Sequence, residues 1–297
     1  MFSGSLVAVV TPMAADGSLD WPAWDRLLDF HLQQGSDGLV IAGTTGESPA
    51  LSTAEIGELT RTAVARCHGR LRVVVGAGTN ATAETVARTR ELSRLGVDGV
   101  MLVTPYYNKP PQEGLYRHFC AAADASAAPV ILYNVPGRTG VDLLPPTVAR
   151  LAAHPRIVAL KEATASLDRG RELLAACPPG FALLSGDDPT AIELIGIGAR
   201  GVISVTGNVA PGRMSAACRA AAGGDLPGAR AIDATLRALH RDLFVESNPI
   251  PVKWALSRMG LIGPGIRLPL VELSAVHRES VERALHAAGV AFEEKAA

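Results

Sequence analysis

Eight apolar runs of strand length recur along the first two thirds of the chain, and amphipathic stretches of helix length separate them. The runs cover residues 6–10, 38–42, 73–76, 99–103, 130–135, 157–161, 182–185 and 201–205. The stretches 24–34, 54–67, 82–95, 112–127 and 168–176 carry apolar residues near helical spacing. Strands that are apolar on both faces and joined by helices form parallel sheets, and eight of them predict a closed (β/α)8 TIM barrel of the α/β class.

An open, doubly wound sheet is the alternative arrangement of such strands and helices. That fold binds nucleotides through a glycine-rich turn after its first strand. The corresponding turn here, residues 11–17 (TPMAADG), lacks the G-x-G-x-x-G pattern, and no such pattern opens another unit. The sequence therefore favours the barrel.

The strand pattern stops at Gly223 and Gly224, and the remaining sequence is helical or loop-like. Helices are expected at 226–244, 251–259 and 277–288, and the glycines and prolines of residues 260–269 indicate a connector. We therefore expect a catalytic barrel over residues 1–224 and a C-terminal helical appendage over residues 225–297.

Charge and composition exclude several classes of partner. The formal net charge is −1 and no basic or acidic block occurs, so neither nucleic acid nor an anionic membrane surface is an expected partner. The sequence contains no run of about 18 apolar residues, and no basic region precedes the first apolar stretch. This pattern predicts a soluble, cytoplasmic protein. Cys67, Cys120, Cys177 and Cys218 lie far apart, so we expect reduced thiols and no metal site.

One lysine ends the sixth apolar run, and a tyrosine lies near the end of the fifth. Lys161 at the mouth of an apolar barrel would lose hydration, which lowers its pKa and leaves more free amine to attack a ketone. A lone lysine in this position more often ends a strand and extends into water. The presence of Tyr133 on the neighbouring run favours an imine-forming enzyme instead.

Other strand ends carry polar side chains, and in this fold the active site collects at these ends. Residues 43–47 (GTTGE) combine two hydroxyls with glycines, which suits a small carboxylate, although a glycine turn that caps the next helix has the same composition. Three of the four tyrosines, Tyr106, Tyr107 and Tyr133, fall at predicted barrel mouths. Each could alternatively be a rim aromatic with a solvated hydroxyl.

Seven motifs together carry a resemblance to a known family. They are residues 43–47 (GTTGE), 104–108 (TPYYN), 133–140 (YNVPGRTG), 160–164 (LKEAT), 184–187 (LSGD), 201–205 (GVISV) and 248–253 (NPIPVK). In this order they resemble the 4-hydroxy-tetrahydrodipicolinate synthases, formerly dihydrodipicolinate synthases, over residues 2 to about 289. The wider superfamily of pyruvate-dependent class I aldolases, including N-acetylneuraminate lyase, shares the lysine and the tyrosine, and Arg138 separates the two.

The resemblance implies a lyase that condenses pyruvate with L-aspartate 4-semialdehyde on the diaminopimelate route to L-lysine, without a cofactor. Lys161 would form an imine with pyruvate, and Tyr133 would move protons at the reacting centre. Thr44 would link Tyr133 to Tyr107, which in the family comes from the neighbouring subunit. Catalysis would then need at least a dimer, and the family implies a homotetramer built as a dimer of dimers.

The resemblance also assigns the substrate contacts. Thr45 would hold the carboxylate of pyruvate, and Arg138 would bind the carboxylate of the semialdehyde through a bidentate guanidinium contact. Gly186 and Ile203 would line the pyruvate pocket, Ile203 through its backbone carbonyl and apolar side chain. A surface ion pair is the alternative role of Arg138.

A second family site binds L-lysine as a feedback inhibitor, and here the match is partial. The residues that match are Ser48, Asn80, Glu84 and Tyr106. Thr53 and Ile56 stand where lysine-sensitive members often carry histidines, and Pro49 replaces a small residue. Ile56 cannot hydrogen-bond an ammonium group, so inhibition by L-lysine is expected to be weak or absent. The alternative for Asn80 and Glu84 is a helix cap followed by an acidic residue in the first turn.

Two other functions remain open from the sequence. A related aldolase could act on a sugar acid or a hydroxy-keto acid, and a substrate screen would distinguish it because Arg138 favours a short carboxylated aldehyde. A barrel that only binds a keto acid is the other alternative. A pure binder needs no imine-forming amine, so Lys161 together with Tyr133 argues against it.

Overall fold

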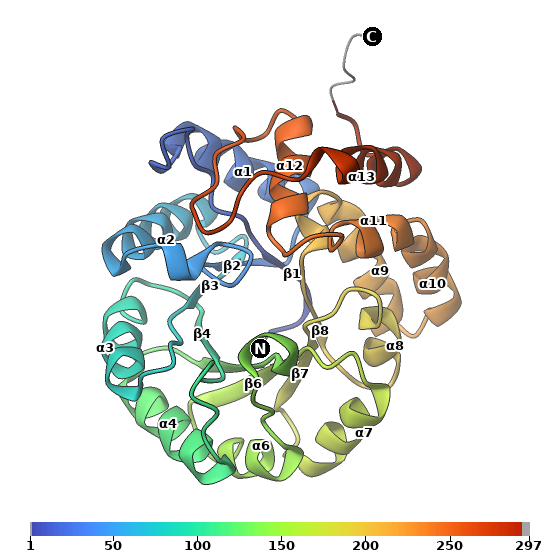
Figure 1. The fold of residues 1–297 in the computed structure, drawn as a ribbon. Helices are drawn as coiled ribbons and strands as arrows, with labels where there is room; N and C mark the ends of the chain where they lie inside the picture. Colours follow the sequence, from blue (N-terminus) through green and yellow to red (C-terminus); the bar gives the residue numbers. More distant parts are fainter. Residues whose placement is uncertain (1, 293–297) are drawn as a thin grey trace.

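The computed structural model describes residues 2–292 and contains a closed parallel barrel (Figure 1). Its strands pair in chain order, and β8 closes the ring by pairing with β1. The strands are β1 (Gly4–Ala8), β2 (Gly38–Ile41), β3 (Arg72–Gly76), β4 (Gly99–Val103), β5 (Val130–Asn134), β6 (Ile157–Glu162), β7 (Ala182–Ser185) and β8 (Gly201–Ser204). The predicted (β/α)8 barrel is confirmed, with strand boundaries shifted by at most two residues.

Helices surround the barrel as an outer ring (Figure 1). They are α1 (Trp21–Gln34), α2 (Thr53–Cys67), α3 (Thr82–Leu92), α4 (Gln112–Ala125), α5 (Pro136–Thr139), α6 (Pro145–Leu151), α7 (Leu167–Ala176), α8 (Ala191–Gly196) and α9 (Pro211–Ala222). Sequence analysis gave no bounds for α5, α6, α8 and α9, and the first three of these helices have seven residues or fewer. Such short segments show too few turns for a helical period to be recognised.

Local signals explain where the first helices begin. The Asp20 side chain accepts a hydrogen bond from the backbone N–H of Ala23 at 3.0 Å, and Gly35 ends α1 in the left-handed conformation. Helix α2 begins with a capping box in which Ser52 and Glu55 bond each other's backbone N–H groups. Each cap satisfies N–H groups that a helix start leaves without partners.

The barrel interior is a separate small apolar cluster inside the ring of strands. Alternate strand residues fill it, among them Leu6, Val74, Ile131 and Ile203. Phe2 closes the end where the strands begin, because a side chain at Gly99 would come within 2.6 Å of its ring. The interior is therefore packed at the amino end of the strands, and the polar side chains lie at the carboxyl end.

The C-terminal region is helical, as expected, and extends along the outside of the ring from α8 and α9 to α1 (Figure 1). It contains α10 (Leu226–Ala234), α11 (Arg237–Asp242), α12 (Ile250–Arg258) and α13 (Ala275–Ala287). The expectation of one helix over 226–244 was wrong, because the chain turns between α10 and α11. There the Thr235 hydroxyl donates to the carbonyl of Ile232 at 2.7 Å, and the N–H of Leu236 bonds Asp233 three residues back.

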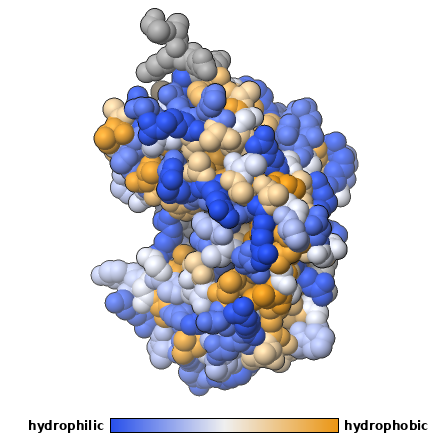
Figure 2. All heavy atoms as spheres, turned by 90° about the vertical axis from the view of Figure 1, so that its right-hand side faces the viewer, coloured by the Kyte–Doolittle hydropathy of each residue, from blue (hydrophilic) through white to orange (hydrophobic). Residues whose placement is uncertain are grey.

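The outer surface mixes residue types. Hydrophilic and hydrophobic residues are interspersed on the face seen in Figure 2. None of the helices within residues 2–292 is long and apolar enough to cross a membrane. In the same part of the chain, Cys67, Cys120, Cys177 and Cys218 are all free thiols.

Candidate active site

Lys161 and Tyr133 lie side by side at the carboxyl end of the barrel. They occupy paired positions on β6 and β5, and each side chain is 5% exposed. The Lys161 Nζ atom lies 4.3 Å from the centre of the Tyr133 ring. The two residues that the sequence selected as an imine-forming lysine and its aromatic neighbour are therefore in contact.

The surroundings shift both residues toward the protonation states that imine chemistry needs. Burial lowers the pKa of Lys161 to about 8, and the Arg138 cation adds to this effect while the Asp188 carboxylate opposes it. Burial also raises the pKa of Tyr133, against the opposing effects of Arg138 and of a hydrogen bond with Thr44. At neutral pH roughly one lysine in ten is then a free amine, and the tyrosine keeps its proton.

Gly186 leaves room for the lysine. A Cβ atom at this position would lie 3.1 Å from Cγ and Cε of Lys161 and 2.8 Å from Cβ of Ala163. Any larger residue would therefore displace the lysine side chain. Ile203 belongs to the interior cluster that also includes Tyr133, where it is fully buried. Gly186 therefore contacts the lysine at the carboxyl end of the barrel, and Ile203 lies in the apolar cluster that includes Tyr133.

The loop of residues 43–47 after β2 brings two hydroxyls into the site. Thr44 hydrogen-bonds Tyr133, and Thr45, 2% exposed, accepts a hydrogen bond at 2.9 Å from the Nδ2 atom of Asn248. The loop is tightly folded, because a Cβ at Gly46 would lie 3.0 Å from the backbone nitrogen of Ala42. The alternative of a simple turn that caps α2 does not apply, because Ser52 supplies that cap.

The loop is held from behind by a buried ion pair. The carboxylate of Glu47 accepts a hydrogen bond from Nζ of Lys253 at 2.5 Å, and both side chains are buried. Burial lowers the pKa of Lys253, and Glu47 opposes this shift. The second carboxylate oxygen accepts the backbone N–H of Arg267 at 3.3 Å. The C-terminal region therefore supports the loop that carries Thr44 and Thr45.

Arg138 stands at the rim of the site on the short helix α5. Its side chain is exposed, and its Nη2 atom donates to the backbone carbonyl of Asn248 at 3.3 Å. It lines two cavities, one of about 290 Å³ that Asn248 and Pro269 also line and one of about 210 Å³ that Ser48 and Tyr106 also line. The guanidinium is thus available to an incoming anion next to the lysine site.

Tyr107 does not reach this site within one chain. Its side chain is 89% exposed, and its backbone adopts a positive φ of 76°. The backbone N–H of Tyr107 donates to the carbonyl of Thr139 at 3.2 Å, which fixes the loop next to α5. Of the four predicted catalytic residues, the structure brings Lys161, Tyr133 and Thr44 together and leaves Tyr107 in solvent.

The residues of the predicted effector site lie in two groups. Ser48 and Tyr106 line the 210 Å³ cavity together with Arg88. The carboxylate of Glu84 pairs with Arg88 at 2.8 Å on α3. Glu84 is in the first turn of α3, as the alternative interpretation expected, but that interpretation was wrong about Asn80, because Ala81 occupies the cap position.

Two neighbouring positions are less favourable to an effector. Ile56 is fully buried in the core on α2, so its side chain is not accessible to a ligand. Thr53 begins the same helix.

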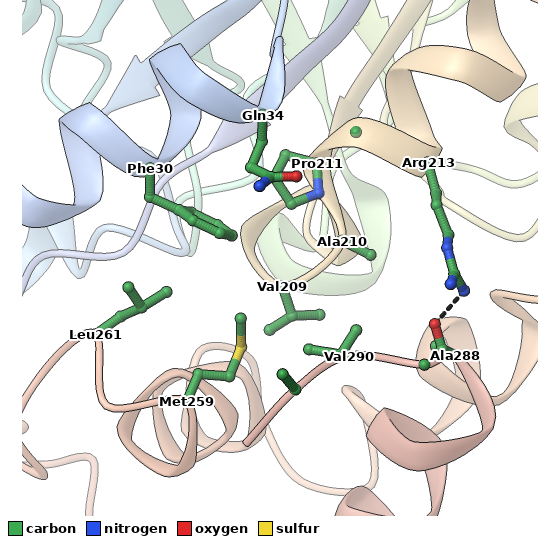
Figure 3. A pocket seen from close by; sticks show the side chains of 13 residues that line it. Phe30, Gln34, Val209, Ala210, Pro211, Arg213, Met259, Leu261, Ala288 and Val290 are labelled. Atoms are coloured by element: carbon green, nitrogen blue, oxygen red, sulfur yellow. Dashed lines mark hydrogen bonds between the residues drawn. The ribbon is translucent and has the colours of Figure 1, made fainter. Parts of the chain in front are cut away.

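The chain also has a larger cavity away from the barrel mouth (Figure 3). It measures about 350 Å³ and lies between α1, the start of α9 and the segment after α13. Phe30, Val209 and Met259 provide apolar walls, and Arg213 donates a hydrogen bond to the carbonyl of Ala288 at its edge (Figure 3). None of the predicted site residues lines it.

Known proteins resemble this chain over nearly its whole length. The model of the dihydrodipicolinate synthetase family matches residues 1–288. The chain belongs to this family. A curated member from Methylococcus capsulatus, named 4-hydroxy-tetrahydrodipicolinate synthase, is 57% identical over 290 residues, which cover 98% of this chain and 100% of the relative.

Solved structures of family members have the same fold. The chloride-inhibited dihydrodipicolinate synthase from Acinetobacter baumannii, solved with pyruvate, superposes with a TM-score of 0.96. It is 47% identical, and the match covers 98% of this chain and 100% of that one. The enzyme from Cyanidioschyzon merolae, solved with lysine bound, is 38% identical with a TM-score of 0.94, over 98% and 99% of the two chains.

Sequence reasoning assigned no role to Asn248, Glu47 or Lys253. The motif of residues 248–253 was recognised, but a local pattern does not indicate what its side chains contact. Asn248 and Thr45 are 203 residues apart, and Lys253 and Glu47 are 206 apart. Only the fold brings them together.

Proposed function

We propose that this chain is a 4-hydroxy-tetrahydrodipicolinate synthase, which condenses pyruvate with L-aspartate 4-semialdehyde on the diaminopimelate route to L-lysine. It is a lyase with a class I aldolase-type mechanism. The single observation that carries the proposal is Lys161, a buried amine whose pKa is lowered to about 8 and which contacts Tyr133. The names of the curated relatives support the same reaction.

In the first step, the free amine of Lys161 attacks the ketone carbon of pyruvate. The new C–N bond forms as the carbonyl oxygen leaves as water, which yields an iminium ion. The positive nitrogen withdraws electrons from the methyl carbon, and that carbon loses a proton to become an enamine. Tyr133 is suited to relay these protons, because its hydroxyl is buried and protonated beside the lysine.

In the second step, the enamine carbon attacks the aldehyde of the semialdehyde and forms the new C–C bond. The aldehyde oxygen takes up the negative charge and then a proton from Tyr133. The guanidinium of Arg138 holds the carboxylate of this substrate, and the Thr45 hydroxyl holds that of pyruvate. Gly186 and Ile203 shape the pyruvate pocket. These steps use only protein side chains, so we propose neither a cofactor nor a metal.

The second subunit enters through Tyr107. Its side chain is 89% exposed on a loop that the Thr139 carbonyl fixes, and an aromatic ring so exposed is suited to insertion into a neighbouring molecule. We propose that the partner's copy of this tyrosine meets Thr44 and completes the proton relay. The assembly is then at least a dimer, and the family resemblance supports a tetramer formed by two such dimers.

Regulation and location complete the proposal. L-Lysine is a candidate effector for the cavity that Ser48 and Tyr106 line with Arg88, the ion-pair partner of Glu84, and Asn80 is a further candidate contact. Because Ile56 is buried and offers no polar group, we propose that L-lysine binds weakly or not at all. We also propose a cytoplasmic location, where the free cysteines of the described chain remain reduced.

Trapping the imine tests the proposal. The chain has four lysines, Lys109, Lys161, Lys253 and Lys295, and pyruvate followed by borohydride should label only Lys161 and abolish activity. Lys253 serves as an internal control, because it is as buried as Lys161 but forms an ion pair with Glu47 and should not react with pyruvate. Peptide mass spectrometry locates the label, and a label on another lysine or no label would overturn the mechanism.

A further inference from the structure

Within residues 2–292, Asn248 alone hydrogen-bonds both of the groups proposed to hold the two substrates. Its Nδ2 atom donates to the Thr45 hydroxyl at 2.9 Å, and its backbone carbonyl accepts from Arg138 at 3.3 Å. The residue is 6% exposed and belongs to the C-terminal region, outside the strands and loops of the barrel.

The direction of the hydrogen bond to Thr45 determines what this threonine can do. A hydroxyl has a single proton to donate and two lone pairs that accept. Because Asn248 donates to the oxygen of Thr45, the threonine keeps its own proton for a ligand. An acceptor in place of Nδ2 would capture that proton and leave only lone pairs facing an anion. The amide thus sets the polarity of the threonine hydroxyl.

The other half of the amide is also informative. The Oδ1 atom of Asn248 is buried and has no hydrogen-bond partner within residues 2–292. A buried acceptor without a partner destabilises a fold, and an apolar residue of the same shape would avoid this cost. The function of the Asn248 side chain is therefore to supply the Nδ2 donor, and packing alone does not require an amide at this position.

We propose that Asn248 is a positioning residue that orients the Thr45 hydroxyl as a donor to the carboxylate of pyruvate. This role rests on the proposed function. The contact with Arg138 uses the backbone carbonyl of Asn248, which a side-chain substitution leaves in place. The side chain of Asn248 therefore acts on pyruvate binding, and the semialdehyde site is largely independent of it.

Two substitutions at this position separate hydrogen bonding from packing. Asn248→Ala removes the donor and should raise the KM for pyruvate about tenfold, the value of one ordinary hydrogen bond. Asn248→Asp has nearly the same shape but can only accept, so it captures the proton of Thr45 and repels the keto acid. It should raise the KM for pyruvate about 10²-fold, while the KM for the semialdehyde changes less than about threefold in both variants.

A double-substitution cycle tests the route through Thr45. In the Thr45→Val background there is no hydroxyl to orient, so Asn248→Ala should have no further effect on the KM for pyruvate. Gln33→Ala, which removes an exposed side-chain amide on α1, is the control and should leave both KM values unchanged. Circular dichroism on each variant sets equal folded concentrations, so a destabilised variant is still compared at its folded fraction.

The outcomes distinguish this role from the proposed function. If wild-type enzyme is labelled at Lys161 but Asn248→Asp binds pyruvate as well as Asn248→Ala or better, the role of Asn248 is wrong and the function stands. An equal rise in the KM values for both substrates would mean that Asn248 only supports the fold, and this result would also overturn the role proposed for Asn248. Absence of label in the wild type overturns the function and this role together.

Discussion

The ammonium group of Lys161 lies 4.3 Å from the centre of the Tyr133 ring, yet the pKa of this lysine is lowered to about 8. A ring face attracts a cation by about 1 kcal/mol, which would raise the pKa. Burial has the opposite effect and is the largest cause of the shift. Loss of hydration therefore outweighs the attraction of the ring, and the share of free amine increases.

Tyr133→Phe keeps the ring contact and removes the hydroxyl. We expect turnover to fall roughly 10²-fold or more, the usual contribution of a positioned acid or base, with little change in thermal stability. Steady-state kinetics measure the loss. Tyr116→Phe removes a tyrosine hydroxyl on the outer helix α4, where the ring packs against Arg150, and should leave turnover unchanged. Wild-type turnover in Tyr133→Phe would reduce Tyr133 to a rim aromatic.

Imine formation should depend on pH through the titration of Lys161. Only the free amine attacks, so the rate should rise with pH and level off above about 8, the pKa of the buried lysine. Single-turnover trapping with borohydride gives the profile. A midpoint near 10.5, the ordinary lysine value, would mean that the amine is solvated before pyruvate binds.

Lys161→Met should make the protein more stable and inactive. The folded state lowers the pKa of Lys161 from 10.5 to about 8, so at neutral pH burying the ammonium costs up to about 3 kcal/mol. Methionine fills similar space without that cost. The gain in the free energy of unfolding should be complete below pH 8. It should disappear gradually between pH 8 and 10.5, because in this range the lysine is already neutral in the folded protein but still charged in the unfolded chain. Urea unfolding of both proteins across this range checks the difference, and a gain that persists at pH 10.5 would contradict the electrostatic cause.

Arg138→Ala should selectively weaken the second substrate. A charge-assisted contact contributes about 1.5–3 kcal/mol, so the KM for L-aspartate 4-semialdehyde should rise roughly 10- to 10²-fold. Imine formation with pyruvate should continue. Arg156→Ala, an exposed arginine just before β6 at the opposite end of the barrel, serves as the control. If both substrates weaken equally, Arg138 organises the site, and an aldolase of sugar acids becomes the better assignment.

L-Lysine should inhibit weakly or not at all. Ile56 is fully buried and Thr53 begins α2, so neither supplies the ring nitrogen that histidine would offer to a ligand. Loss of one or two charged hydrogen bonds, at about 1.5–3 kcal/mol each, weakens binding by roughly 10- to 10⁴-fold. Activity titrated with L-lysine at sub-saturating pyruvate measures this. Half-inhibition at sub-millimolar concentration would mean that Ser48, Asn80, Glu84 and Tyr106 suffice.

The strands were predictable because a strand buried on both faces is a continuous apolar run. Gly99–Val103 and Ala182–Ser185 were predicted residue for residue. Short helices such as Pro145–Leu151 were not, because seven residues give two turns and no readable period. The position of Lys161 beside Tyr133 followed from the same reasoning, since neighbouring parallel strands bring their ends together.

Contacts between distant segments could not be predicted in this way. The contact of Asn248 with Thr45 joins the C-terminal region to the second strand's loop across 203 residues, and no local period encodes it. The motif of residues 248–253 contributed to the family resemblance but did not indicate what Asn248 and Lys253 contact. Tyr107 is exposed in the fold of one molecule, and the role proposed for it depends on a second chain.

The hydrogen-bonded pairing of β8 with β1 has a consequence for how copies of this protein can associate. A closed ring has no edge strand, so no copy can extend the sheet of another. Association must rely on loops and helix faces, such as the loop that presents Tyr107. Because each ring is already complete, a few surface substitutions would abolish the proposed assembly and proton relay while the barrel stays folded. The quaternary state can therefore evolve separately from the fold.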